Sequence, residues 1–184
     1  MMKPLLIVLC GFGLFAGQTH SQTIKLSCTG QVDRYTRELN GELKPANQSL
    51  FFEKFFISPV VNKKGAANGF MLESEMTGKW VNKNTTQVLA KGLTKPLKEL
   101  IINDTVSVEF KQDMLLASNH SNQAYRLSEG DDRLHFYRIA TLITADLKTG
   151  EIRIDQDAVD SDFSSDKTNF YFRYTGECLV SGQL

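Results

Sequence analysis

Histidine, cysteine and excess charge are all scarce in this sequence, and each scarcity argues against a class of function. The 184 residues include three His, three Cys and one Trp, and 21 Lys and Arg balance 21 Asp and Glu. A chain without net charge or a basic block lacks the field that attracts phosphate backbones or an anionic membrane surface, so we expect no nucleic-acid partner. A zinc or catalytic site would need more His and Cys at recognisable spacing.

Long apolar runs are also absent beyond the first residues. A basic residue precedes the apolar run 5–16, which has the length of a signal-peptide core and is too short to span a bilayer. Thr19 and Ser21 are small residues at the −3 and −1 positions of a cleavage site after Ser21. The sequence therefore predicts a signal peptide over residues 1–21, one β-rich domain over residues 22–184, no membrane span, and a secreted or periplasmic location.

The most frequent pattern is the alternation of apolar and polar residues that is typical of half-buried β-strands. It is clearest in 24–33, 105–110 and 170–180, and further strands are predicted over 50–57, where Pro59 stops the strand, over 69–81, and weakly over 124–127.

One hairpin and one helix complete the predicted elements. Residues 134–155 form the hairpin, with Gly150 able to take the positive φ of its turn. Thr94 and an early proline predict a short helix over 94–101. The pattern favours an all-β, single-domain antiparallel barrel or sandwich, up-and-down or calycin-like, with at most one short helix.

Two cysteines remain once the signal peptide is removed, Cys28 near the start of the mature chain and Cys178 near its end. Each lies in the apolar phase of its predicted strand, so we expect both to point into the core. An even number of cysteines in an exported chain predicts a disulfide bond between them. The alternative is a pair of buried free thiols.

Four short segments carry a resemblance to a known group of proteins. They are Leu26-Ser27-Cys28-Thr29-Gly30, Tyr137-Arg138-Ile139, Leu147-Lys148-Thr149-Gly150-Glu151-Ile152 and Tyr174-Thr175-Gly176-Glu177-Cys178. The sequence resembles uncharacterised small exported bacterial β-rich proteins with an early Cys-x-Gly, a late strand that ends in a Thr-Gly turn, and a closing Gly-x-Cys. The resemblance implies a β-rich fold, a signal peptide and a terminal disulfide, and it implies no activity, cofactor or site residue.

Few side chains offer catalytic chemistry. His120 lies in a polar segment that predicts an exposed turn, and His135 shares a strand face with Tyr137, where a structural role is the simpler interpretation. The segment 155–166 is rich in aspartate, but it lacks the glycine and glutamate that an EF-hand requires. We interpret it as a solvated loop, with a nonstandard Ca²⁺ site as the open alternative. We therefore expect no catalytic residue, no cofactor and no metal site.

Adjacent aromatic residues are the most informative feature, because neighbours on a strand point to opposite faces. They occur at Phe51-Phe52, at Phe55-Phe56 and over 170–174. Both faces of these strands therefore carry apolar surface, which is covered by a second layer or else lines a ligand cavity or a partner surface. The candidate binding surface is the set Tyr171, Phe172, Arg173 and Tyr174 on the last strand.

Two functions fit these observations, and neither is enzymatic. The first is an exported non-enzymatic β-domain that binds a small apolar ligand or serves as an envelope accessory protein. The alternative is a protein-interaction module, such as an inhibitor or immunity-type protein, that docks through an aromatic face, and a hydrolase is the least supported class. An apolar interior open at one end favours a ligand, whereas a filled core with an exposed aromatic patch favours a protein partner.

Overall fold

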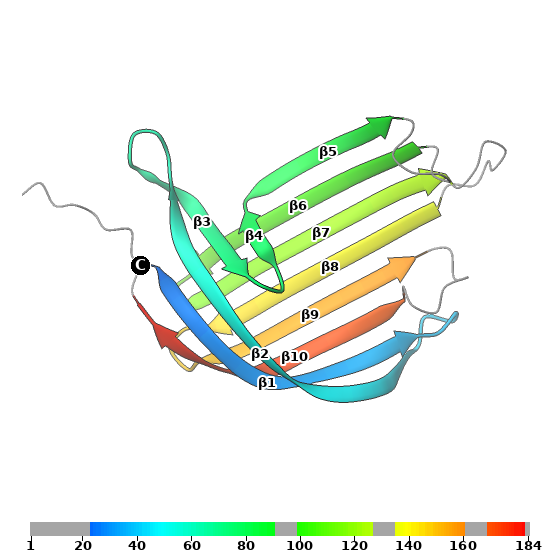
Figure 1. Ribbon diagram of the computed structural model, residues 1–184, viewed down its shortest axis with the longest axis horizontal. Coiled ribbons are helices and arrows are strands. Elements are labelled where there is room, and N and C mark those ends of the chain that lie inside the picture. Colours follow the sequence, from blue (N-terminus) through cyan, green and yellow to red (C-terminus); the bar gives the residue numbers. More distant parts are fainter. Residues whose placement is uncertain (1–22, 91–98, 127–134, 161–168, 183–184) are drawn as a thin grey trace, which may run out of the picture.

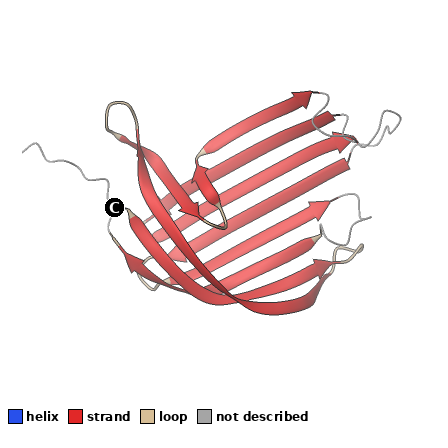
Figure 2. Ribbon diagram, viewed as in Figure 1, coloured by secondary structure: helices blue, strands red, loops and turns tan. Residues whose placement is uncertain are grey.

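The computed structural model describes residues 23–90, 99–126, 135–160 and 169–182, which form one antiparallel sheet (Figures 1 and 2). Its strands are β1 (Ile24–Arg37), β2 (Leu43–Val61), β3 (Ala67–Ser74), β4 (Gly78–Val81), β5 (Lys83–Ala90), β6 (Glu99–Lys111), β7 (Met114–Arg126), β8 (His135–Asp146), β9 (Glu151–Asp160) and β10 (Phe170–Ser181). Their order is β4-β3-β2-β1-β10-β9-β8-β7-β6-β5, and the sheet curls into a nearly closed barrel. The predicted all-β antiparallel fold is confirmed, as a barrel.

Side chains close the seam of the barrel. β4 and β5 lie at opposite ends of the sheet order, yet only Asn82 separates them in the chain. The Val108 N–H of β6 donates a hydrogen bond to Asn82 Oδ1 at 2.6 Å. The ring of Phe70 on β3 meets that of Phe110 on β6 edge-on, with centroids 4.6 Å apart. β3 and β4 therefore lie against β6, as Figure 1 shows in front view.

The apolar core fills the part of the barrel that β3 and β4 cover. Its largest fully buried side chains are Phe55, Leu26, Ile57, Leu72, Leu115, Ile143, Ile154, Val108 and Cys28. They come from seven of the strands, and Trp80 of β4 joins them. Side chains from facing strands therefore pack against one another in this part of the interior.

Two strand boundaries differ from the prediction. Pro59 does not stop β2, because it lies opposite Phe70 next to a register shift, where the missing N–H of proline is tolerated. The strand predicted over 69–81 is in fact the hairpin of β3 and β4, whose turn spans 75–77. Gly78 follows this turn with φ 62°, a conformation that glycine adopts at no steric cost.

The predicted helix and a predicted turn are also corrected. Residues 94–98 lie outside the described residues, and Glu99 to Ile101 are strand, paired with β7. His120 lies within β7, paired with Thr105 and Ala140, and its side chain is exposed. The polar residues around His120, from Ser118 to Asn122, pair with β6 on one side and β8 on the other. This pairing places them in a strand in spite of their weak β-propensity. The predicted signal peptide lies outside the described residues.

The predicted hairpin between β8 and β9 is confirmed. Gly150 takes a φ of 83° at its turn. The Asp146 carboxylate accepts hydrogen bonds from the backbone N–H groups of Lys148 at 2.8 Å and Thr149 at 3.0 Å. These bonds, that of Thr149 first, lower the pKa of Asp146 and fix the path of the turn.

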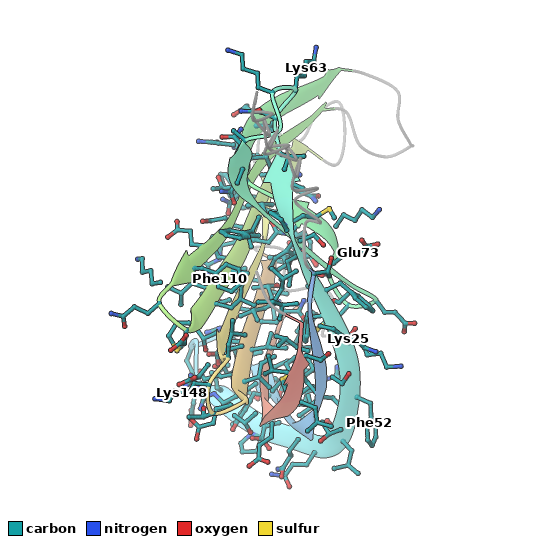
Figure 3. The ribbon with its side chains drawn as sticks, turned by 90° about the vertical axis from the view of Figure 1, so that its left-hand side faces the viewer. Lys25, Phe52, Lys63, Glu73, Phe110 and Lys148 are labelled. Atoms are coloured by element: carbon teal, nitrogen blue, oxygen red, sulfur yellow. A yellow bond between two sulfur atoms is a disulfide. The ribbon has the colours of Figure 1, made fainter. Side chains whose placement is uncertain are left out.

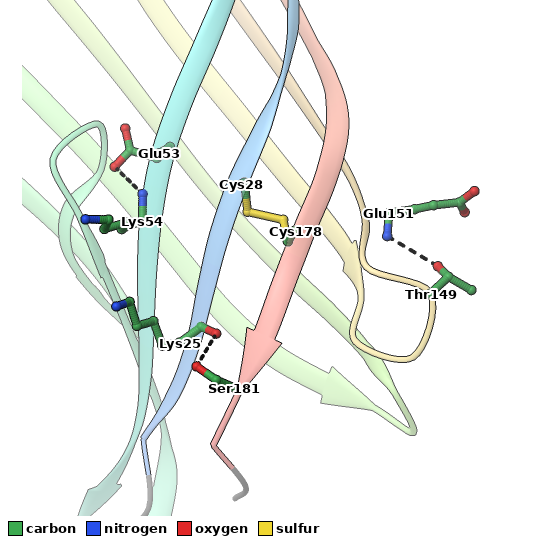
Figure 4. Close-up of a disulfide and its surroundings, with 8 residues drawn as sticks. All are labelled: Lys25, Cys28, Glu53, Lys54, Thr149, Glu151, Cys178 and Ser181. Carbon is green, nitrogen blue, oxygen red and sulfur yellow. Dashed lines mark hydrogen bonds between the residues drawn. A yellow bond between two sulfur atoms is a disulfide. The ribbon is translucent and has the colours of Figure 1, made fainter.

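The predicted disulfide is present between β1 and β10 (Figure 4). Cys28 and Cys178 lie opposite each other in the register, with an S–S distance of 2.02 Å and a Cα–Cα distance of 3.9 Å. Gly30 and Gly176 also pair, two residues further along. A Cβ added to Gly30 would lie 2.6 Å from the Gly176 Cα and 2.7 Å from the ring of Phe51. Two facing glycines thus allow the first and last strands to approach closely beside the bond.

Candidate functional site

The two faces of β10 have different surroundings. Phe172 and Tyr174 point inward and pack against the core. The ring of Tyr174 meets that of Phe51 edge-on, with centroids 5.6 Å apart. Tyr171 and Arg173 occupy the other phase and point to the outer face. The four residues predicted as one candidate surface are therefore divided, and two of them belong to the outer face.

Asp155 on β9 collects hydrogen bonds from three side chains of this outer face. Arg173 lies opposite it in the register and donates from Nε to Oδ1 at 3.1 Å. Arg153 donates from Nε at 2.6 Å and from Nη2 at 3.2 Å. The Tyr171 hydroxyl donates to the same carboxylate and accepts a bond from Arg173 Nη2 at 2.8 Å. These mutual bonds hold Tyr171 and Arg173 in one arrangement.

A second aspartate on the same face, Asp157, binds two more arginines. Arg37 Nη2 lies 2.6 Å from its Oδ1, and Arg138 Nη2 lies 3.1 Å from its Oδ2. The Tyr35 ring lies 5.7 Å from that of Tyr171 and extends the cluster onto β1. We call this set the arginine network: Arg37, Arg138, Arg153, Arg173, Asp155, Asp157, Tyr35 and Tyr171. Two guanidinium groups share each carboxylate, so the charge of the set is positive.

The network moves two pKa values in opposite directions. Burial alone would raise the pKa of Asp155, but hydrogen bonds from its arginine and tyrosine partners outweigh burial and hold it below the ordinary 3.8. Burial, and then the hydrogen bond to Asp155, raise the pKa of Tyr171 above its ordinary 10.0. Folding thus favours the ionised form of Asp155 and the neutral form of Tyr171.

We expect Asp155→Asn to lower the free energy of unfolding by about 2 kcal/mol at neutral pH, because two guanidinium groups lose their anionic partner. The folded-state pKa of Asp155 lies below its unfolded value. The stability that ionised Asp155 contributes is therefore complete above the pKa of Asp155 in the unfolded chain. This stability is lost as the pH falls through the pKa of Asp155 in the folded protein. Urea unfolding of both proteins from neutral pH to about pH 2 measures this loss. A difference between them that stays constant with pH would contradict it.

The interpretation of 155–166 as a solvated loop is wrong for its first half. Residues 155–160 belong to β9, so Asp155 and Asp157, two residues apart, share one face of the strand. Arginines of β1, β8 and β10 bind them there. The remainder lies outside the described residues. Among the residues that the structure describes, no group of three or more His, Cys, Asp and Glu is placed to hold a metal. His135 is the first residue of β8, and its side chain is outside the described set.

Further along the same outer face, beyond the arginine network, the surface is apolar and exposed. The exposed fractions are 75% for Leu50, 75% for Phe52 and 81% for Leu179, and Phe56 is 40% exposed. A hollow of about 650 Å³ runs over β10, β1, β2 and β3, lined in part by Phe52, Phe56 and Leu179. Figure 3 shows Phe52 on the outer side of β2. We call this surface, with Leu50 at its end, the outer furrow.

The furrow exists because small side chains lie between large ones. Ser27 of β1 pairs with Leu179 on one side and Lys54 on the other. Thr29, two residues along the same strand, pairs with Phe52. Short side chains on β1 thus form a floor between the taller walls of β10 and β2. Sequence reasoning found the adjacent phenylalanines but not Leu179, whose partner across the strands becomes known only with the register.

Charged groups surround the furrow. Glu73 of β3 and Glu75 of the turn after it lie at its margin with Lys54. Lys79 pairs with Glu73 at 3.6 Å. The Glu53 carboxylate accepts the backbone N–H of Lys54 at 3.3 Å and of Glu75 at 3.1 Å, so it fixes the margin between β2 and β3. The arrangement is an apolar centre with a polar rim, as in many protein interfaces.

Comparisons with known proteins found no match to this chain among family models, curated proteins or solved structures. Within the described residues there is no helix with the length and apolar character needed to cross a membrane.

Proposed function

We propose that this chain is an exported, non-enzymatic interaction module that docks a protein partner through the outer furrow. The observation that carries the proposal is the exposure of Leu50, Phe52 and Leu179 on one continuous face. Apolar side chains that gather on one face and are rimmed by polar groups are typical of protein-binding surfaces. The disulfide supports export, because such bonds persist in oxidising compartments such as the periplasm or the extracellular space.

A protein partner fits the furrow better than a small apolar ligand does. A small-molecule site encloses most of the surface of its ligand. Phe52 and Leu179, which would have to form its walls, are themselves three-quarters or more exposed. An aromatic ring that projects so far buries most of its apolar surface only when a second protein surface covers it. The cluster of buried apolar side chains beneath the furrow supports the same choice.

The arginine network supports the proposal from the neighbouring part of the face. Its tyrosine and arginine side chains are held in place by mutual hydrogen bonds. Ordered side chains of these two types lose little entropy on binding and are enriched among the residues that dominate interface energetics. A partner large enough to cover the furrow would extend over Gln31 and Thr175, which pair between the two surfaces.

Photo-cross-linking in cells that export the protein tests this function. A benzophenone amino acid replaces Phe52, and we expect one predominant protein adduct. A second substitution, Leu179→Ser, should abolish this adduct because it removes the opposite wall of the furrow. Leu39→Ser is the matched control, since Leu39 is 80% exposed and Leu179 81%, but Leu39 lies in the turn after β1. An adduct that survives Leu179→Ser, or none at all, would refute the docking surface.

A further inference from the structure

We propose that the inward face of the barrel, beyond the core, binds a small organic anion through Arg34. Arg34 belongs to the inward phase of β1, together with Cys28 and Val32 of the core. It lies one residue pair beyond Val32 of the core, on the side away from β3 and β4. β3 pairs with β2 over Phe56 to Val61, and β4 pairs with β3. This site lies on the opposite face of the sheet from the outer furrow and is independent of it.

The Arg34 guanidinium lacks an anionic partner among the described residues. Its charged group lies over the ring of Phe172, 5.5 Å from the centroid. Its Nε is buried and has no hydrogen-bond partner. Contact with an aromatic ring uses the face of the guanidinium, whereas its N–H donors lie in the plane of the group. The ring contact therefore leaves these donors available, and a partly buried cation without a counter-charge favours an incoming anion.

The residues around Arg34 match an oxyanion ligand. One cross-strand row on the inward face reads Asn47, Arg34, Phe172, Gln156, Thr141, Asn119 and Val106. The row contains amide and hydroxyl donors and no carboxylate that would compete for the guanidinium. Gln156 Nε2 lies 3.4 Å from Thr141 Oγ1, so adjacent strands orient these donors together. The nearest row that contains a carboxylate has Asp104, which Lys83 binds at 3.3 Å.

Apolar residues on both sides of this row indicate an organic anion and not an inorganic one. The row toward the core contains Tyr174, whose side chain is partly exposed. The row away from it contains Phe170 and Ile139, which are also partly exposed, and Phe170 stacks edge-on against Phe172 with centroids 4.7 Å apart. A planar carboxylate can pair with the guanidinium through two hydrogen bonds while an attached ring or short chain contacts these side chains. The ligand class is thus a small carboxylate with an apolar body.

The test is a titration of the full mature protein with benzoate, and separately with inorganic sulfate, followed by the NMR signals of the arginine Nε–H groups. We expect benzoate to produce a saturable shift of the Arg34 signal and to bind more tightly than sulfate. Arg34→Gln should weaken benzoate binding at least about tenfold, as expected for loss of a charge-assisted hydrogen-bonded pair. Arg138→Gln, on the outer face, is the matched control and should change the affinity less than twofold.

Arg34→Lys covers the case in which Arg34→Gln does not fold. It retains the charge but not the bidentate geometry, so it should weaken benzoate binding less than Arg34→Gln and more than the control. The absence of a saturable Arg34 shift in the wild-type protein overturns the proposal. Sulfate binding as tight as benzoate overturns the organic ligand class, and equal losses in the Arg34 and Arg138 variants overturn the site.

Discussion

Loss of the Cys28–Cys178 bond is expected to have the largest effect on stability, about 5 kcal/mol of the free energy of unfolding. The two cysteines are 150 residues apart in the chain, so the bond closes a long loop. In the chain-entropy model the stabilisation increases with the logarithm of loop length and reaches this value for such a loop. The loss is of the same order as the whole stability of a small protein.

Urea unfolding of the native protein, of the reduced protein and of the double variant Cys28→Ala with Cys178→Ala measures this effect. Reduction retains both sulfur atoms, so it separates the cross-link from the packing that the alanine variant also loses. The reduced protein and the double alanine variant should each unfold at a much lower urea concentration than the oxidised protein, or be unfolded in water. An unchanged midpoint after complete reduction would show that the bond does not constrain the unfolded chain in this way.

Phe55→Ala is expected to have the second largest effect, a loss of about 3 to 5 kcal/mol. Phe55 is 0% exposed and is among the largest fully buried side chains of the core. Its removal leaves a cavity that the surrounding strands cannot fill without distortion. Phe56, the next residue along β2, points to the outer furrow and is 40% exposed.

Phe56→Ala is therefore a control matched in residue type, strand and position. We expect it to cost less than about 1 kcal/mol, because surface substitutions seldom exceed this. Thermal and urea unfolding of the two variants compare the values directly. Equal losses would mean that the two faces of β2 are buried to the same degree in solution.

The sequence predicts the elements whose alternation is regular. β1 and β10 carry an unbroken apolar phase from Ile24 to Val32 and from Phe170 to Cys178, and both strands and their disulfide were predictable. β5 was not, because its Asn84, Thr85 and Thr86 are polar residues common in loops. The local signal for a strand was limited to its β-branched residues, Thr85, Thr86 and Val88.

The candidate site was only partly predictable, because it depends on the register between strands. Tyr171, Phe172, Arg173 and Tyr174 were predicted together as one candidate surface, and the structure divides them, with Phe172 and Tyr174 packed against the core. Nothing in the sequence connects Arg173 to Asp155, which lies 18 residues away and becomes its neighbour through the pairing of β9 with β10. The outer furrow likewise depends on the alignment of β10, β1 and β2, which local patterns do not determine.

The position of the disulfide also determines how the barrel responds to mechanical force. β1 begins and β10 ends at the same side of the sheet, where Lys25 pairs with Ser181. A pull on the two chain ends would therefore unzip the antiparallel pairs one at a time, and after Ser27 and Leu179 it would reach Cys28 and Cys178. There the tension passes from one sulfur to the other. β2 to β9 form a covalent loop beyond that point and bear no load, so the barrel resists extension until a reductant opens the bond.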